Sequence, residues 1–228
     1  MEQFSAEHLA AVGALVLLSA VLVRLARRRE REWGDAAARS LATLILAVYL
    51  AEHVTYLARD TWSVDENLPL HLTDAVTLVA VAALWRPRIR LLVEILYFWA
   101  FSASLQAVLT PGVGRPFPDV LYFTYFVIHG GVLMAAALLV FGCRRFPRPR
   151  AVPRVYGITA AFAVVAAVAC VTTGGNYLFL RDKPPRESLL DLMGPWPWYI
   201  VGGAVLGLAM FVALAALAEV VRRREAGP

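Results

Sequence analysis

The sequence predicts an all-α membrane protein, a polytopic bundle of seven transmembrane helices with its N-terminus outside and its C-terminus in the cytoplasm. Two observations support this prediction. First, 60% of the 228 residues are hydrophobic, against the ~45–50% typical of soluble domains. Second, the apolar residues form continuous runs of about 20 residues, the length at which a helix rising ~1.5 Å per residue crosses a ~30 Å hydrocarbon core. Continuous runs favour helices over the alternating strands of a barrel.

The apolar stretches can be delimited in chain order. They span residues 8–26, 36–57, 68–85, 91–109, 119–142, 155–173 and 198–220. The first follows acidic residues and precedes arginines, the reverse of a signal peptide, so we expect it to remain as a helix. We therefore expect one transmembrane helical domain over residues 1–228.

The charged residues predict the orientation of these helices. Most of the 22 lysines and arginines lie in four connections, at 24–39, 86–90, 144–154 and 222–224. With seven helices, all four lie on one side, which the positive-inside rule makes cytoplasmic. The opposite loops carry the acidic residues Asp60, Asp65, Glu66, Asp119, Asp182, Glu187 and Asp191.

The net charge of +5 therefore reports topology and does not indicate a nucleic-acid partner. We expect membrane lipids as partners and a multi-pass location in a cell membrane. The sequence does not indicate an oligomeric state.

The longest connection, 174–197, contains apolar residues between rigid Gly and Pro turns. We expect it to form an extracytoplasmic lid over the mouth of the bundle. The alternative is an interfacial anchor, because aromatic residues are common at membrane surfaces.

Ionisable and amide side chains inside spanning helices carry the functional prediction, because each is costly in lipid and usually faces a bundle interior or a wet cavity. The candidates are Glu52, His53, His71, Thr73, Asp74, Gln106 and His129, with Asn176 and Tyr177 just beyond helix six. They come from different helices but fall in the outer half of the bilayer. We therefore expect one polar cavity that opens outward. Glu94 lies near the inner interface, and we expect it to pair with Arg90 at i−4 as a structural contact.

Two details refine this cavity. His71 and Asp74 have i, i+3 spacing and are expected to share a helix face. His129 is followed by Gly130 and Gly131, which allow close approach of a helix or a ligand. The alternative is that these polar groups only form hydrogen bonds between helices. No metal-binding motif accompanies the histidines, so the sequence predicts neither a metal nor a cofactor.

Four segments carry a resemblance to a known family: NLPLHLTD (67–74), LQAVLTPG (105–112), HGG (129–131) and the long stretch 174–199. They resemble the bacterial YwaF-like integral membrane proteins. These are distantly similar to eukaryotic transmembrane acyltransferases of ether phospholipids and to the androgen-induced-gene membrane hydrolases. The resemblance to the hydrolases implies a threonine and histidine pair, at Thr73 and His129 here. The acyltransferases have Pro-Cys-His where this chain has Pro69-Leu70-His71, so their cysteine mechanism does not transfer.

Three functions remain open at this point. The first is a lipid-ester hydrolase or acyltransferase, in which Thr73 attacks the ester, His129 acts as general base, and His71 or Asp74 orients or stabilises. Substrate contacts are then expected from Glu52, His53, Gln106, Asn176 and Tyr177. The second is a transporter of a small solute or protons. The third is a receptor or assembly factor without chemistry.

Overall fold

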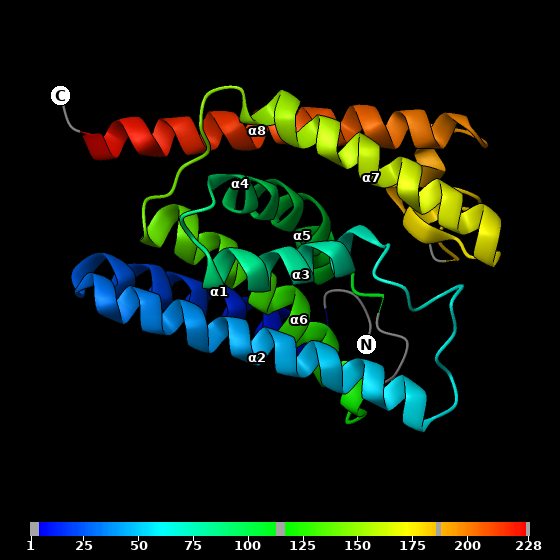
Figure 1. The fold of residues 1–228 in the computed structure, drawn as a ribbon, viewed down its shortest axis with the longest axis horizontal. Helices are drawn as coiled ribbons and strands as arrows, with labels where there is room; N and C mark the ends of the chain where they lie inside the picture. Colours follow the sequence, from blue (N-terminus) through cyan, green and yellow to red (C-terminus); the bar gives the residue numbers. More distant parts are fainter. Residues whose placement is uncertain (1–4, 113–116, 186–187, 227–228) are drawn as a thin grey trace.

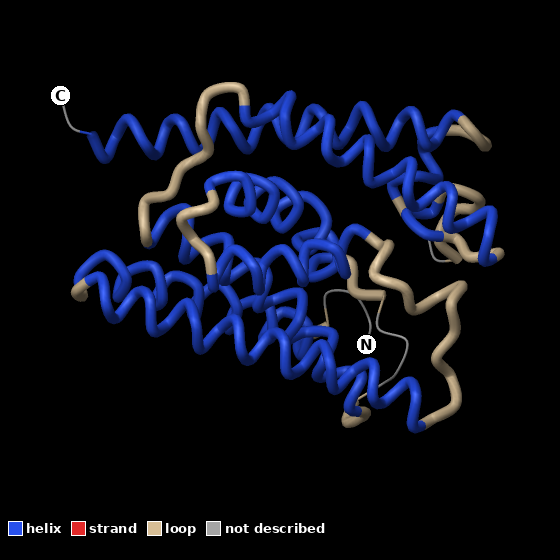
Figure 2. Tube along the Cα trace, in the orientation of Figure 1, coloured by secondary structure: helices blue, strands red, loops and turns tan. Residues whose placement is uncertain are grey.

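The structure is a computed structural model that describes residues 5–112, 117–185 and 188–226. These residues form helices joined by short loops, with no strand among them (Figure 2). The long helices are α1 (Ala6–Arg28), α2 (Arg31–Ala58), α6 (Val120–Ala137), α7 (Ala151–Thr173) and α8 (Trp198–Ala226). The shorter ones are α3 (Leu72–Trp85), α4 (Arg90–Trp99) and α5 (Leu105–Leu109). Two turns are π-helical: η1 (Ala100–Ser104) joins α4 to α5, and η2 (Leu138–Gly142) extends α6. Two further turns, η3 (Tyr177–Phe179) and η4 (Leu189–Met193), are 3₁₀ helices.

All the apolar stretches expected from the sequence are helical, with ends that differ by a few residues. Within the described ranges, six helices are long and apolar enough to cross a membrane, and these include Arg90–Leu109 and Val120–Gly142 as continuous units. The third stretch gives only the 14 residues of α3. Its predicted start at residue 68 is wrong, because Leu68 and Leu70 form a turn that includes Pro69 and the helix begins at Leu72.

The helices pack around a central layer. In Figure 1, α1 and α2 (blue) lie on one side, α7 and α8 (yellow to red) lie on the other, and α3, α4 and α6 lie between them. The fully buried apolar residues lie mostly on the central helices, as Val76, Leu96 and Val132 illustrate. The outer helices instead expose apolar side chains, such as Val16 and Val168. An apolar surface of that kind is expected where helices face lipid.

The two ends of the bundle differ in charge. The arginine-rich connections 29–30, 86–89 and 143–150 lie at the same end as the C-terminal end of α8, and we call this the arginine end (Figure 1). There, Glu225 of α8 forms ion pairs with Arg27 and Arg144. The loops 59–71 and 174–185 lie at the opposite end, which we call the acidic end (Figure 1).

Glu94 lies at the arginine end with its side chain only 1% exposed. Its carboxylate accepts hydrogen bonds from the backbone and side chain of Arg148 at 2.8–3.0 Å and from Arg154 at 2.7 Å. The expected pairing with Arg90 is wrong, because the Arg90 guanidinium donates to the Phe146 carbonyl at 2.8 Å. The 143–150 loop folds back over the start of α4 and brings more distant arginines to this carboxylate.

The glycine pair after His129 allows helices to approach closely. A Cβ on Gly131 would lie 2.9 Å from Ile45 of α2, and one on Gly130 would lie 3.2 Å from Leu15 of α1. The close approach expected from the sequence is therefore made by helices, and it brings α6 against α1 and α2 beside His129.

Candidate functional site

A polar cavity of about 160 Å³ lies at the acidic end, among α2, α3, α6 and the 59–71 loop. We call it the polar cavity. Its lining residues are Glu52, His53, Tyr56, Glu66, Asn67, Thr73, Asp74, Tyr125, Ile128 and His129. Five of the residues proposed from the sequence are thus brought together: Glu52, His53, Thr73, Asp74 and His129.

Helical spacing explains how each element presents its residues. On α2, Glu52 and Tyr56 are four residues apart, and on α6, Tyr125 and His129 have the same separation. Residues at i and i+4 lie one above the other on a helix face. Each of these two helices therefore turns a single polar stripe toward the cavity.

Thr73 and Asp74 lie in the first turn of α3, where backbone N–H groups have no partner within the helix. The Asp74 carboxyl group accepts a hydrogen bond from the backbone of His71, the residue that precedes the helix. This is half of the reciprocal bonding of a capping box, so Asp74 helps to begin the helix. The Thr73 hydroxyl lines the cavity and has no hydrogen-bond partner among the residues described.

His129 has a buried ring nitrogen, Nδ1, without a hydrogen-bond partner in the described part of the chain. Its ring packs edge-on against Tyr125, with centroids 4.4 Å apart. The Tyr125 hydroxyl donates to the Ala107 carbonyl at 2.7 Å and accepts from the Gly112 backbone at 3.2 Å. The imidazole therefore packs against an anchored ring while one nitrogen remains unused. A buried unpaired polar atom is uncommon and needs an explanation.

The lining is acidic. Glu52, Glu66 and Asp74 carry carboxyl groups, and no lysine or arginine is among the described lining residues. The Glu52 carboxyl accepts a hydrogen bond from Thr124 at 3.1 Å and repels the carboxyl of Asp74. The cavity thus gathers carboxyl groups that no lysine or arginine of its described lining balances.

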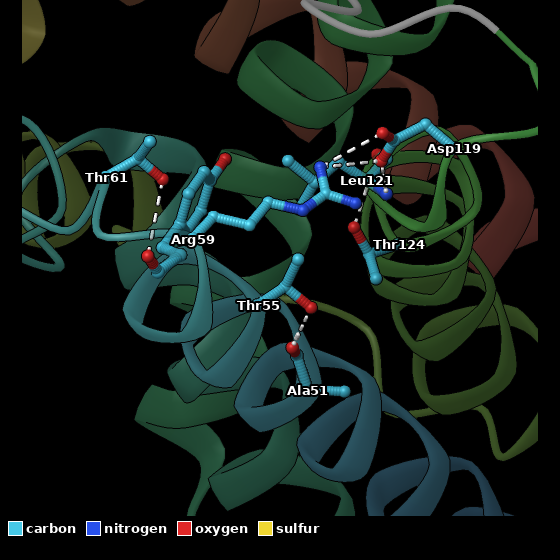
Figure 3. A network of polar contacts seen from close by, with 8 residues as sticks. Ala51, Thr55, Arg59, Thr61, Asp119, Leu121 and Thr124 are labelled. Carbon is cyan, nitrogen blue, oxygen red and sulfur yellow. Dashed lines mark hydrogen bonds and ion pairs between the residues drawn. The ribbon is translucent and has the colours of Figure 1, made fainter.

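An ion pair fixes the two helices that carry Glu52 and His129. Figure 3 shows Arg59, just after α2, reaching to Asp119 at the start of α6, with nitrogen–oxygen distances of 3.0 and 3.2 Å. Asp119 also accepts a hydrogen bond from the Leu121 backbone at 2.9 Å and so caps α6. This contact joins the end of α2 to the start of α6 at the acidic end, in addition to the packing of the two helices.

His71 lies outside the polar cavity. It precedes the first helical residue, so the expectation that it shares a helix face with Asp74 is wrong. Its ring packs against Tyr177 and Phe179, with centroid distances of 5.3 and 5.7 Å. A role for His71 in orienting the site stays a prediction.

Three other candidates also lie away from the lining. Gln106 is exposed and contacts Met210 of α8 at 3.7 Å. The Asn176 side chain accepts from the Arg181 backbone at 3.0 Å and donates to the Asp182 carbonyl at 2.8 Å, which closes a local turn. Their assignment as substrate contacts stays a prediction.

Tyr177, the third, is fully buried and joins two loops. Its hydroxyl donates to the Val64 carbonyl at 2.6 Å and accepts from the Leu68 backbone at 3.2 Å. Burial raises the pKa of this hydroxyl, which keeps the proton that it donates. Tyr177 thus holds the 59–71 loop, which supplies Glu66 and Asn67 to the cavity.

The segment 174–197 packs mainly on the ends of α7 and α8. Met193 of η4 lies against Gly202 of α8, and Gly175 lies against the backbone of Asp65. None of its described residues lines the polar cavity, and the 59–71 loop covers that side instead. A lid role for 174–197 stays a prediction, and Glu187 lies outside the described residues.

The sequence did not single out five lining residues: Tyr56, Glu66, Asn67, Tyr125 and Ile128. Tyr56 and Tyr125 could have been found, because each lies four residues from a predicted site residue on the same helix. Asn67 begins the segment NLPLHLTD that carries the resemblance, but neither it nor Glu66 was predicted as a site residue, and the fold of a loop brings both to the cavity.

The comparisons with known proteins agree with this membrane architecture. The model of the TMEM164 family matches residues 3–215, which is nearly the whole chain. No curated protein and no solved structure gave a significant match. The chain therefore belongs to the TMEM164 family.

Proposed function

We propose that this protein is a membrane-embedded lipid-ester hydrolase or acyltransferase, in which Thr73 is the nucleophile and His129 is the general base. One observation carries the proposal: both side chains line the same cavity, and His129 has a buried nitrogen without a partner. A threonine hydroxyl needs an adjacent base to become a useful nucleophile. An unpartnered imidazole nitrogen in the same small cavity can supply one.

The chemistry balances without a cofactor. The Thr73 hydroxyl oxygen attacks the ester carbonyl carbon as its proton passes to His129, and the carbonyl electron pair moves onto oxygen. Collapse of that intermediate breaks the bond to the leaving alcohol, which takes the proton from His129. The acyl group is then transferred from Thr73 to water, giving hydrolysis, or to a lipid hydroxyl, giving acyl transfer. In either case His129 accepts the proton of the incoming oxygen and returns it to the Thr73 oxygen as the acyl bond to Thr73 breaks.

The acidic lining also limits the substrate. Three carboxyl groups line the cavity together with Thr73, and no lysine or arginine of the described lining offers a partner to an anionic group held next to the reacting ester. We therefore expect esters without net negative charge at that position to react faster. The lining residues described all belong to the acidic end, which favours a closed reaction site over a transport path through the bundle.

We also propose the finer topology of seven crossings with the acidic end outside the cell. The arginine-rich connections lie together at the other end, as the positive-inside rule requires of a cytoplasmic face. With 14 residues, α3 rises about 21 Å, so the turn before it completes this crossing. In a chain with both cysteines replaced by serine, we expect an impermeant maleimide to label Lys183→Cys on intact cells and Arg88→Cys only after permeabilisation. The reverse pattern would overturn this orientation.

The resemblance to bacterial YwaF-like proteins supports a bacterial plasma membrane as the location. It also supports the pairing of Thr73 with His129, through the distant similarity to the androgen-induced-gene hydrolases.

The test of catalysis is covalent labelling of purified protein with a fluorophosphonate probe, together with hydrolysis of a fluorogenic lipid ester. We expect Thr73→Ala to abolish labelling, and His129→Ala to lower the hydrolysis rate by ~10²–10⁴-fold, as for loss of a general base. Thr73→Ser keeps a hydroxyl and should retain labelling. Thr55→Ala is the matched control, because the Thr55 hydroxyl bonds only its own helix at Ala51 (Figure 3).

Two results would contradict the proposal. One is a purified protein that the probe does not label and that cleaves no ester. The other is labelling of Thr73→Ala and His129→Ala equal to that of the Thr55→Ala control.

A further inference from the structure

A second hollow lies on the surface of α7 and shares no residue with the polar cavity. It has a volume of about 360 Å³, within the ~300–1,000 Å³ typical of small-molecule sites. We call it the α7 groove. Its lining residues are Ala167, Cys170, Val171, Leu180, Arg181 and Trp196.

The groove opens on a face of α7 that meets lipid. Val164, Val168 and Val171 lie along this helix with exposed fractions of 64%, 59% and 85%. On a helix that crosses the membrane, such exposure is toward acyl chains. A hollow with apolar walls at that position is filled more favourably by hydrocarbon than by water, which finds few hydrogen-bond partners there.

One cation stands at the edge of this apolar hollow. The Arg181 side chain is exposed, and its Nη1 donates to the Gly174 carbonyl just beyond the end of α7. Its Nε and Nη2 have no partner among the described residues. These two nitrogens present the parallel N–H groups that bind phosphate in a bidentate manner. The neighbouring Lys183 is engaged by Asp191 at 3.6 Å, so Arg181 is the cation that faces the groove.

The wall opposite α7 is held in place. The Trp196 indole N–H donates to the Leu180 carbonyl at 3.1 Å, and the Cys170 thiol donates to the Tyr177 carbonyl at 3.5 Å. Tryptophan prefers the headgroup level of a bilayer, where an apolar ring and a polar tip are both satisfied. The groove thus has an apolar trough next to a cation. A phospholipid at the same depth in the bilayer has its acyl chains next to its phosphate.

We propose that the α7 groove binds one phospholipid of the adjoining leaflet, with an acyl chain in the trough and the phosphate on Arg181. This site requires only that the protein is inserted in a membrane. It is independent of the chemistry proposed for Thr73 and His129, and its test does not measure catalysis.

The test uses the full chain in nanodiscs and the fluorescence of Trp196, isolated as the difference from the Trp196→Phe variant. Two probes are titrated at low mole fraction in a matrix of digalactosyldiacylglycerol, a bilayer lipid that has no phosphate and therefore does not compete for Arg181. One is phosphatidylcholine with brominated acyl chains, and the other is diacylglycerol with the same chains and no phosphate. We expect the phospholipid to quench Trp196 at lower mole fractions than the diacylglycerol does.

The variants separate the two halves of the site. Arg181→Gln should weaken the apparent affinity for the phospholipid about tenfold, as for the loss of a charge-assisted hydrogen bond, and leave quenching by diacylglycerol unchanged. Ala167→Phe should fill the trough and lower quenching by both probes. Lys183→Gln is the matched control, and we expect it to change neither.

Equal quenching by the two probes would overturn the phosphate contact, and so would an Arg181→Gln variant that behaves like Lys183→Gln. Quenching by both probes that Ala167→Phe does not reduce would overturn the acyl trough. Circular dichroism of each variant checks that the helices remain folded.

Discussion

Two groups of ionisable side chains are held at opposite ends of this bundle, and they differ in how they are partnered. At the arginine end, Glu94 is buried but accepts hydrogen bonds from Arg148 and Arg154 on both of its oxygens. At the acidic end, the polar cavity gathers carboxyl groups without a lysine or arginine in its described lining, and His129 keeps a buried nitrogen without a partner.

The difference indicates different roles. A buried carboxylate that accepts hydrogen bonds on both oxygens holds together the elements that donate them. Its loss leaves the charges of its partners unbalanced. Unpaired polar groups inside a membrane protein lower its folding stability, and such groups are typical of functional sites. Glu94 is therefore structural, and the polar cavity is the candidate for chemistry.

The largest expected effect is on Glu94. Glu94→Gln keeps the size of the side chain but removes the charge that balances Arg148 and Arg154. We expect a loss of about 3–5 kcal/mol in the free energy of unfolding, as for other broken buried ion pairs. Thermal and denaturant unfolding in detergent measure it. The control is Glu219→Gln, which removes a carboxylate paired with Arg222 and Arg223 on the surface. If both variants unfold alike, the structural role of Glu94 is lost.

An intermediate effect is expected at Tyr177, whose hydroxyl hydrogen-bonds the 59–71 loop that lines part of the polar cavity. Tyr177→Phe keeps the ring beside His71 but leaves the Val64 carbonyl and the Leu68 N–H unpaired. The expected loss is about 1–3 kcal/mol, the cost of unsatisfied buried groups. Tyr156→Phe, which removes one hydrogen bond to Ala204, is the control in the same unfolding assay. A loss no greater than that of the control would show that Tyr177 does not hold the loop.

The smallest effect is expected within the polar cavity. Glu52→Gln and Asp74→Asn remove the repulsion between two carboxyl groups and keep the oxygens that accept from Thr124 and from the His71 backbone. We expect unfolding free energy to stay the same or rise by up to about 1 kcal/mol, as when an active site is neutralised. A loss as large as that of Glu94→Gln would make the cavity structural and remove the contrast between the two ends.

Much of the fold could be predicted from the sequence, because apolar run length is a local property that a membrane turns directly into helices. The start of α3 was the main error, because Leu68 and Leu70 on either side of Pro69 extend the apolar run into a turn that is not helical. The partner of Glu94 was also wrong. Sequence spacing favoured Arg90, whereas the 143–150 loop folds back and brings Arg148 to this carboxylate, and Arg154 reaches it from α7.

The candidate site could likewise be predicted only in part from the sequence. Glu52, His53, Thr73, Asp74 and His129 were recognisable because ionisable and polar groups in apolar runs are conspicuous. Gln106 and Tyr177 were equally conspicuous, yet the first faces α8 and the second fastens a loop. Glu66 carried no local signal, and Asn67 was marked only as the first residue of the NLPLHLTD segment.

The sequence by itself determined that the chain is a helical membrane protein, where its helices lie, and that polar groups cluster toward one end. These features follow from composition along the chain and from the length of helix that a bilayer requires. Only the tertiary structure decided which polar groups share a cavity, which form hydrogen bonds or ion pairs, and which stay unpaired. Those properties depend on helix rotation and loop course, which are set by contacts between residues far apart in the sequence.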